Sequence, residues 1–272
     1  RSRTAPGNPA RFPMIDVDQL TYTYPGRPPV FQDFSWQAQR GEAWAVLGPS
    51  GCGKTTLLYL LAGLRLPTGG AVRIDGRPVE RPRPHTGLIL QEYGLLPWAT
   101  VRQNAELGLR IRAFYGPDGK HAPQDFHPDL DLDPWLERLG LLAIQHAYPG
   151  HISGGQRQRT AIARTLALEP DLLLMDEPFS SLDAPTREGL QNLMLELWKE
   201  RQAGRNPLTM LIVTHAIEEA AVLGRKILML GLPPNTVPQV IDNPNAGQPG
   251  FRETAGYLAL VRQMRRRLEG LS

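Results

Sequence analysis

The chain has 272 residues, of which 41% are hydrophobic and 21% are charged, a composition typical of a globular protein with a substantial core. It excludes a collagen, a coiled coil and a wholly disordered chain. Thirty basic residues against 27 acidic ones leave a net charge of +3, too small to indicate a nucleic-acid partner, and the single cysteine excludes an internal disulfide.

The first residues, 1–13, are rich in Arg, Pro and Gly and lack the apolar run of a secretory signal, so we expect a disordered arm. From residue 14 to about 91, short apolar runs alternate with turn signals. This pattern predicts strands at 44–47, 71–74 and 88–90, with a helix at 55–64 among them. No window reaches the roughly 20 uninterrupted apolar residues of a membrane span.

From about residue 92 to 168 the apolar spacing becomes helical, at 101–113, 135–142 and 156–168. A stretch rich in Pro, Asp and His at 114–134 predicts a surface excursion. Beyond Pro170, strands (172–175, 210–213, 226–230) alternate with helices (190–199, 217–222), which is typical of a parallel sheet covered by helices. We therefore expect an α/β domain over 14–230, a helical insertion at about 92–168, and a loosely patterned tail over 231–272.

A glycine-rich motif follows the apolar run at 44–47. Its residues are Gly48, Pro49, Ser50, Gly51, Cys52, Gly53, Lys54, Thr55 and Thr56, which match the phosphate-binding P-loop pattern G-x-x-x-x-G-K-[ST]. Glycines let the backbone curl so that its N–H groups and the next helix N-terminus face a polyphosphate. We expect Lys54 to supply a point charge to the phosphates and the Thr55 hydroxyl to bind Mg²⁺.

Two adjacent carboxylates end the apolar run at 172–175. The carboxyl ends of parallel strands are where ligands bind to open α/β sheets, and adjacent side chains on a strand diverge. We expect Asp176 to hold the Mg²⁺ shell and Glu177 to act as general base on the attacking water.

A second glycine turn lies between these motifs. Ile152, Ser153, Gly154, Gly155 and Gln156 precede a basic helical stretch, and here the sequence resembles the ATPase subunits of ABC transporters, whose signature is LSGGQ. The resemblance implies a P-loop NTPase (RecA-like) core with a parallel sheet, an antiparallel β subdomain and an inserted α-helical subdomain. It also implies that Ser153, Gly154, Gly155 and Gln156 close on ATP held by a second copy.

Further positions match the same family. Tyr24 resembles the aromatic residue that stacks on adenine. Tyr22 lies on the same strand face, two residues away, so the alternatives are that Tyr22 stacks on adenine or that neither tyrosine does. Gln91 resembles the Q-loop glutamine that senses Mg²⁺ and water, Asp183 belongs to a D-loop-like Ser181-Leu182-Asp183, and His215 resembles the switch histidine at the γ-phosphate.

The resemblance implies an ATPase at the cytoplasmic face of the membrane. Its cofactors would be ATP and Mg²⁺. Its expected partners are a second, identical ATPase subunit, transmembrane permease subunits and, for an importer, indirectly a solute-binding protein. No nucleic acid is expected. The run from Gln91 to Asn104, with Leu95-Leu96-Pro97-Trp98, is similar to nitrate, sulfonate and taurine importers. The alternatives are a lipid or drug exporter ATPase and a soluble ABC ATPase outside transport.

Three other features have simpler interpretations. Cys52 fills space within the P-loop rather than acting as a nucleophile. The acidic and histidine residues of the excursion match no ligand spacing and predict a solvated loop; they are His121, Asp125, His127, Asp129, Asp131 and Asp133. The arginines of the tail (Arg262, Arg265, Arg266, Arg267) predict a solvated helix face, with contact to anionic lipid as the alternative.

Overall fold

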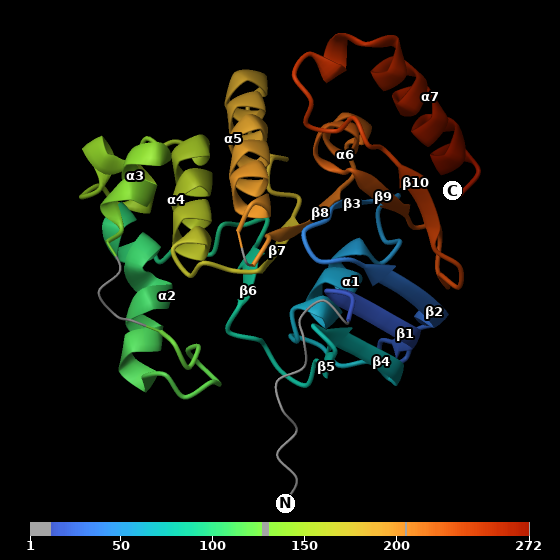
Figure 1. The fold of residues 1–272 in the computed structure, drawn as a ribbon, viewed down its shortest axis with the longest axis horizontal. Coiled ribbons are helices and arrows are strands. Elements are labelled where there is room, and N and C mark those ends of the chain that lie inside the picture. Colours follow the sequence, from blue (N-terminus) through green and yellow to red (C-terminus); the bar gives the residue numbers. More distant parts are fainter. Residues whose placement is uncertain (1–11, 127–130, 205, 272) are drawn as a thin grey trace, which may run out of the picture. The chain divides into compact units, whose positions relative to one another are not determined.

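The fold was analysed in a computed structural model that describes residues 12–126, 131–204 and 206–271. The predicted arm at 1–13 lies outside the described residues except for Phe12 and Pro13. The described chain forms two compact units (Figure 1). The first comprises the chain up to Pro82 and from His215 onward, and the second runs from Arg83 to Thr214.

An antiparallel sheet occupies the amino-terminal part of the first unit (Figure 1). Its central strand β1 pairs with β2 on one side and β4 on the other, so that Ile15 lies opposite both Ala38 and Ile74. Apolar side chains of β1 are buried on one face, as expected for a sheet with one packed face. The strands are β1 (Ile15–Thr23), β2 (Pro29–Ala38), β4 (Gly69–Ile74) and β5 (Arg77–Pro78).

The rest of the first unit carries the strand that leads into the P-loop. This strand, β3, is buried along its whole length and pairs in parallel with β9, which pairs antiparallel with β10. The tail after Gly231, where only a solvated helix face bearing arginines was expected, forms β10 and α7. The elements are β3 (Ala43–Leu47), α1 (Lys54–Leu61), α6 (Ile217–Leu223), β9 (Lys226–Met229), β10 (Gln239–Asp242), the 3₁₀ turn η3 (Phe251–Glu253) and α7 (Ala255–Glu269).

The second unit contains three parallel strands among its described residues, with β7 between β6 and β8. Leu174 at the middle of β7 pairs with Leu88 and Leu211, and all of β7 and β8 is buried. Strands that are buried on both faces have continuous apolar sequences, which is why β7 and β8 were predicted well. The three parallel strands are β6 (Thr86–Ile89), β7 (Leu172–Asp176) and β8 (Thr209–Thr214).

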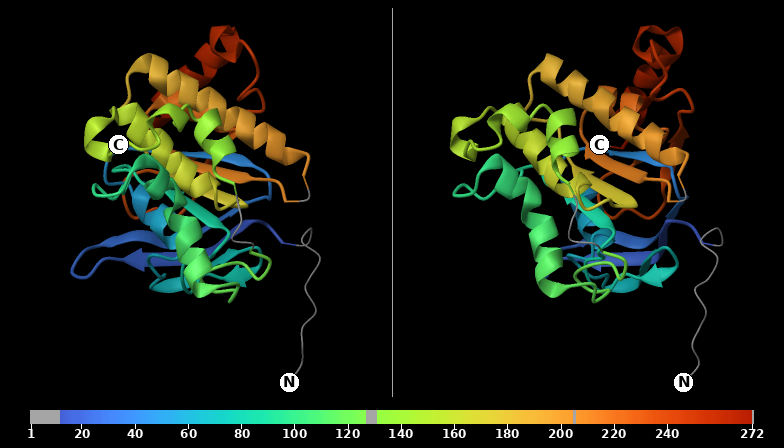
Figure 2. Two further views of the ribbon diagram at one scale, coloured as in Figure 1. Left: turned by 90° about the vertical axis from the view of Figure 1, so that its left-hand side faces the viewer. Right: turned by 60° about the vertical axis from the view of Figure 1, so that its left-hand side comes forward.

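The second unit also contains several helices, with α2 packed along α4 (Figures 1 and 2). At Gly108 of α2 an added Cβ would lie 2.9 Å from the Leu168 side chain, so the two segments approach closely. The helices are α2 (Val101–Tyr115), α3 (Asp133–Arg138), η1 (Leu142–Ile144), η2 (Pro149–His151), α4 (Gly154–Leu166) and α5 (Ala184–Gln202). No helix in the described ranges is both long and apolar enough to cross a membrane.

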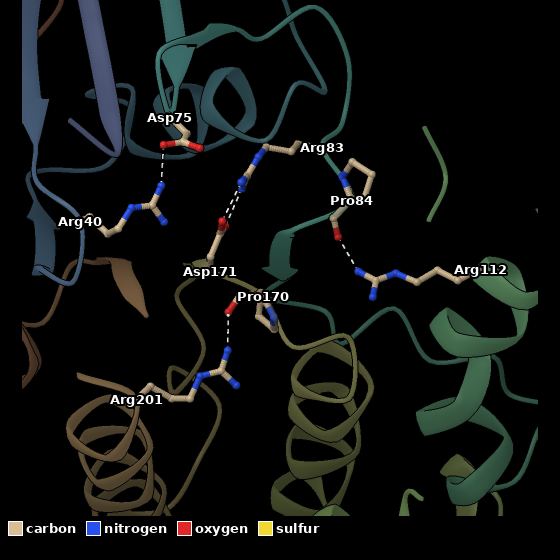
Figure 3. Close-up of polar contacts among 8 residues, drawn as sticks. All are labelled: Arg40, Asp75, Arg83, Pro84, Arg112, Pro170, Asp171 and Arg201. Atoms are coloured by element: carbon tan, nitrogen blue, oxygen red, sulfur yellow. Dashed lines mark hydrogen bonds and ion pairs between the residues drawn. The ribbon is translucent and has the colours of Figure 1, made fainter. Parts of the chain in front are cut away.

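Arginines fasten the amino-terminal ends of β6 and β7 (Figure 3). Arg83 makes a two-point ion pair with Asp171, with Nη2 2.6 Å from Oδ2. Arg112 donates to the carbonyl oxygens of Pro84 and Leu168, and Arg201 donates to that of Pro170. The bonds of Arg112 and Arg201 satisfy backbone carbonyl oxygens that lie just outside the strands.

Candidate functional site

The predicted phosphate-binding loop joins β3 to α1 in the first unit. Gly51 and Gly53 adopt the left-handed backbone region, with φ of 80° and 106°, which costs other residues free energy. At Gly48 an added Cβ would lie 2.5 Å from the carbonyl oxygen of Leu230. Gly53 caps α1 without a side chain, so the first-turn N–H groups are available to an anion.

Lys54 opens α1, and its side chain is folded into this loop. Its Nζ donates to the carbonyl oxygens of Gly48 at 2.8 Å and of Pro49 at 3.0 Å. Only 6% of Lys54 is exposed, so its positive charge is held against the loop backbone. Thr55 is exposed in the same turn, whereas Thr56 is buried; Ser50 is also exposed.

Cys52 is fully buried within the loop. Burial raises the pKa of its thiol, and the nearby Lys54 charge only partly opposes that effect. A protonated, buried thiol is a poor nucleophile. The surroundings of Cys52 therefore support the expectation that its side chain fills space.

The two candidate adenine-stacking tyrosines differ in exposure. Tyr22 is buried, whereas Tyr24 is half-buried. The Tyr24 hydroxyl lies 3.1 Å from that of Thr56, which brings the ring beside α1. Arg65 lies over the Tyr24 ring, 4.9 Å from its centroid, and donates to the Tyr22 hydroxyl. Of the two, only Tyr24 is accessible enough to stack on a base.

In the second unit, β7 ends at the two predicted carboxylates. Asp176 is 5% exposed, and Glu177 follows with a φ of 45°. The Glu177 backbone N–H donates to Val213 on β8 at 2.9 Å, which anchors this unusual conformation. Gln91 comes from the loop after β6, and its Nε2 lies 3.5 Å from Glu177 Oε2. Two predicted catalytic side chains, Gln91 and Glu177, therefore meet.

The second glycine turn begins α4 with a reciprocal cap. The Ser153 hydroxyl accepts from the Gln156 N–H at 3.2 Å, and the Gln156 side chain accepts from the Ser153 N–H at 2.8 Å. The hydroxyl proton of Ser153 is not used by this cap, so it can be donated to an anion. Ser153 is exposed, which leaves this end of α4 accessible.

The Asp183 turn packs against the same glycines. At Gly155 an added Cβ would lie 2.7 Å from Thr186 Cγ2. The Thr186 N–H donates to Asp183 Oδ2 at 3.2 Å, and hydrogen bonding to Thr186 lowers the pKa of Asp183. Asp183 thus caps α5 as an ionised carboxylate.

The family model described as ABC transporter matches residues 31–180. The chain belongs to the ABC transporter family. It is an ATPase of that family, with the α/β P-loop NTPase fold that its motifs predicted.

Several ABC relatives cover most of this chain. The taurine import ATP-binding protein TauB of Yersinia pestis is 43% identical over 224 residues, 82% of each chain. The nitrate import ATP-binding protein NrtD of Synechococcus elongatus is 39% identical over 86% of this chain and 81% of that protein. The ATP-binding cassette MJ0796, solved as a dimer bound to ADP and Pi, aligns with a TM-score of 0.68 at 28% identity, covering 84% of this chain and 98% of that one. The predicted resemblance to nitrate, sulfonate and taurine importer ATPases is confirmed.

The switch-like histidine of the ABC pattern, His215, directly follows β8 and is exposed. It belongs to the first unit, as do the P-loop and Tyr24, whereas Gln91, Ser153, Asp176, Glu177 and Asp183 belong to the second.

Two residues beside the ABC motifs were missed by the sequence analysis. Tyr93 has its hydroxyl 2.5 Å from Ser181 Oγ, which joins the Gln91 loop to the Asp183 turn. Arg65 lies on the Tyr24 ring. Neither has a motif of its own, although the positive φ of Tyr93, 62°, marks a constrained turn.

The surface excursion provides no metal site among the residues that the structure describes. His121 instead pairs with Asp118, at 2.6 Å between Nδ1 and Oδ2, and stacks on Tyr115. His127 and Asp129 lie outside the described residues.

Proposed function

We propose that this chain powers the import of a small anion of the taurine, sulfonate or nitrate class. In this proposal two copies close on two Mg-ATP at the cytoplasmic face of the membrane, and each site combines the P-loop of one copy with Ser153–Gln156 of the other. Hydrolysis reopens the dimer and drives separate permease subunits. A solute-binding protein delivers the transported solute to these permease subunits.

The observation that carries the hydrolytic part of the proposal is the position of Glu177. It ends a buried strand in a constrained backbone conformation, with its carboxylate near the Gln91 amide. A carboxylate fixed in this way can accept a proton from water, whereas its neighbour Asp176 is nearly buried.

The proposed roles of the other residues follow from their chemistry. Tyr24 stacks on the adenine, the backbone N–H groups and Lys54 bind the phosphates, and His215 donates to the γ-phosphate. Gln91 orients the attacking water for Glu177. Ser153 and the first turn of α4 present donors to the ATP of the opposite copy, and Asp183 lies at the facing surface.

The oxygen donors Thr55, Gln91 and Asp176 suit a hard cation such as Mg²⁺. They are a hydroxyl, an amide and a carboxylate, none of them a soft ligand. When bound, Mg²⁺ supplies charge neutralisation and polarisation of the phosphate oxygens.

The loop 95–98 supports docking to a permease. Trp98 is 71% exposed, an unusual state for so large an apolar side chain. The loop is nevertheless ordered, because Asn104 bonds the backbone of Leu96 in both directions. An ordered loop that exposes an apolar side chain suits a protein partner, and the similarity to TauB and NrtD favours an importer permease.

Glu177→Gln tests the proposed base. The amide keeps the size and hydrogen bonding of the side chain but cannot accept the proton, so ATP hydrolysis should fall by about 100-fold or more. ATP should still bind, and the ATP-bound dimer should persist on size-exclusion chromatography in Mg-ATP.

The matched control is Glu137→Gln, the same change at an exposed position of α3. It should hydrolyse ATP like the wild type. A Glu177→Gln protein that stays monomeric in saturating Mg-ATP, or that turns over normally, would contradict the proposed role.

A further inference from the structure

Asn235 connects distant parts of the first unit. It lies in the connection between β9 and β10, is 7% exposed, and its Nδ2 donates to the carbonyl oxygen of Cys52 at 2.8 Å. Cys52 belongs to the P-loop, and 183 positions separate the two residues. We propose that Asn235 is a positioning residue for the phosphate-binding loop.

The consequence for the loop follows from the geometry of the peptide bond. In a planar trans peptide the C=O and the following N–H point in opposite directions. When Asn235 holds the Cys52 carbonyl, it also fixes the direction of the Gly53 N–H, away from Asn235. Gly53 has a φ of 106° and no side chain to restrain it, so this peptide would otherwise rotate readily. Asn235 thereby fixes one of the N–H donors proposed to bind phosphate.

Asn235 is itself held firmly. Its backbone N–H donates to the carbonyl oxygen of Val30, and its own carbonyl accepts from the Gln32 N–H. Its side-chain Oδ1 accepts from the Gly231 N–H at 3.0 Å. The start of β2 and the backbone just after β9 therefore both determine where Nδ2 points.

The surrounding packing supports the same role. At Gly53 an added Cβ would lie 2.5 Å from Val30 Cγ1, and at Gly48 it would lie 2.5 Å from the Leu230 oxygen. The loop thus rests directly on the two backbone segments that hold Asn235. Lys54 bonds the carbonyl oxygens of Gly48 and Pro49, and Asn235 holds the next bonded carbonyl along the loop.

Asn235→Asp is the test substitution. The carboxylate keeps the acceptor for Gly231 but replaces the donor with negative charge facing the carbonyl oxygens of Cys52 and Val30, to which Nδ2 donates at 2.8 Å and 3.3 Å. The matched control is Asn243→Asp, because Asn243 is also buried and donates to two backbone carbonyls, of Ala221 and Gly224, both at 2.8 Å. Both changes remove the same kind of contact from the same unit.

Two measurements separate loop positioning from general stability. Cys52 is the single thiol of the chain and is fully buried, so its reaction with Ellman's reagent reports opening of the P-loop. In Asn235→Asp that reaction should be about tenfold faster than in Asn243→Asp, and the dissociation constant for ATP about fivefold higher, since an unsatisfied buried partner strongly favours rearrangement.

The inference rests on the proposed phosphate-binding role of the loop, but the thiol reaction does not. If the wild type fails to bind ATP, the proposed function fails while the labelling still tests Asn235. If Asn235→Asp does not fold, Asn235→Ala, which removes the donor without adding charge, replaces it. Equal labelling rates and ATP affinities in the Asn235 and Asn243 variants would overturn the inference.

Discussion

His85 lies beside the arginines that fasten β6 and β7, and its environment disfavours a positive charge. Burial lowers the pKa of His85, and the charges of Arg83 and Arg112 act in the same direction. The carboxylates of Asp171 and Asp125 oppose the effect without cancelling it. The native protein therefore favours neutral His85 more strongly than the unfolded chain does.

This shift makes stability depend on pH in a defined direction. An unfolded histidine titrates at about pH 6.5, and the native His85 only at lower pH, so the unfolded chain binds more protons as the pH falls. The contribution of neutral His85 is fully present above the unfolded pKa and is lost as the pH falls toward the native one. His85→Gln, which does not titrate, should lose less stability than the wild type between pH 7.5 and 5.5 in urea unfolding. Equal losses would show that His85 does not carry this dependence.

At the level of single residues, the sequence predicted which side chains carry functional groups better than it predicted which side chains contact one another. Asp176 and Glu177 follow an apolar run, so their place at a strand end could be predicted from pattern. The contact of Cys52 with Asn235 could not, because no periodic pattern relates side chains so far apart in the chain. Tyr24 was the expected stacking residue, but Tyr22 stayed open as an alternative because strand alternation places both on one face, and their burial now distinguishes them.

The start of α2 shows how one helix orders the loop before it. Asn104 is fully buried, and its side chain bonds the backbone of Leu96, Ala99 and Thr100. Thr100 and Gln103 add a reciprocal cap. The asparagine satisfies turn groups that would otherwise be buried without partners.

Asn104→Ala should lower the free energy of unfolding by about 2 kcal/mol, because several buried backbone groups lose their partner. Thr100→Ala, which removes only the cap, should cost about 1 kcal/mol. Chemical denaturation of both variants measures the difference. An Asn104→Ala protein as stable as Thr100→Ala would mean that water or rearrangement replaces those bonds.

Strands that are buried along their whole length were predicted best. Helix ends were predicted least well, because capping residues determine where a helix starts and stops. The helix expected at 135–142 ends at Arg138, because Gly140 takes a positive φ of 65°. The helix expected at 190–199 already begins at Ala184, where Asp183 caps it. In both cases a local end signal outweighed the apolar spacing from which the prediction was made.

At the scale of the whole molecule, the proposed site needs two copies of the chain. Ser153→Arg places a bulky cation at the exposed start of α4 and leaves the subunit's own P-loop unchanged. ATP binding by the monomer should therefore survive, whereas dimerisation and hydrolysis should fail. Lys54→Ala should lose ATP binding itself.

Mixed dimers make this test sharper. A Ser153→Arg subunit paired with a Lys54→Ala subunit retains one site that combines an unaltered Lys54 with an unaltered Ser153. Differently tagged heterodimers should keep measurable hydrolysis, which neither homodimer shows. If the Ser153→Arg monomer loses ATP affinity as fully as Lys54→Ala, the signature serves its own subunit and the two-chain site is wrong.

The overall fold was predictable because its motifs occur in a fixed order along buried strands. The two-unit division was not, since the chain leaves the first unit after Pro82 and returns at His215. In the tail, β10 was missed and α7 was expected only as a helix face around its arginines, because few side chains of these elements are buried: Ile241 in β10, and Leu260 and Met264 in α7. Sparse burial leaves a weak apolar pattern.

The left-handed backbone of Glu177 has a consequence for protein engineering. At a φ of 45°, the backbone conformation costs glycine about 1 kcal/mol less than it costs glutamate. A screen that rewards heat tolerance alone will therefore enrich glycine at the position of the proposed base. Libraries of this enzyme have to be sorted on turnover as well, because thermal selection and catalytic selection favour opposite residues at this one turn.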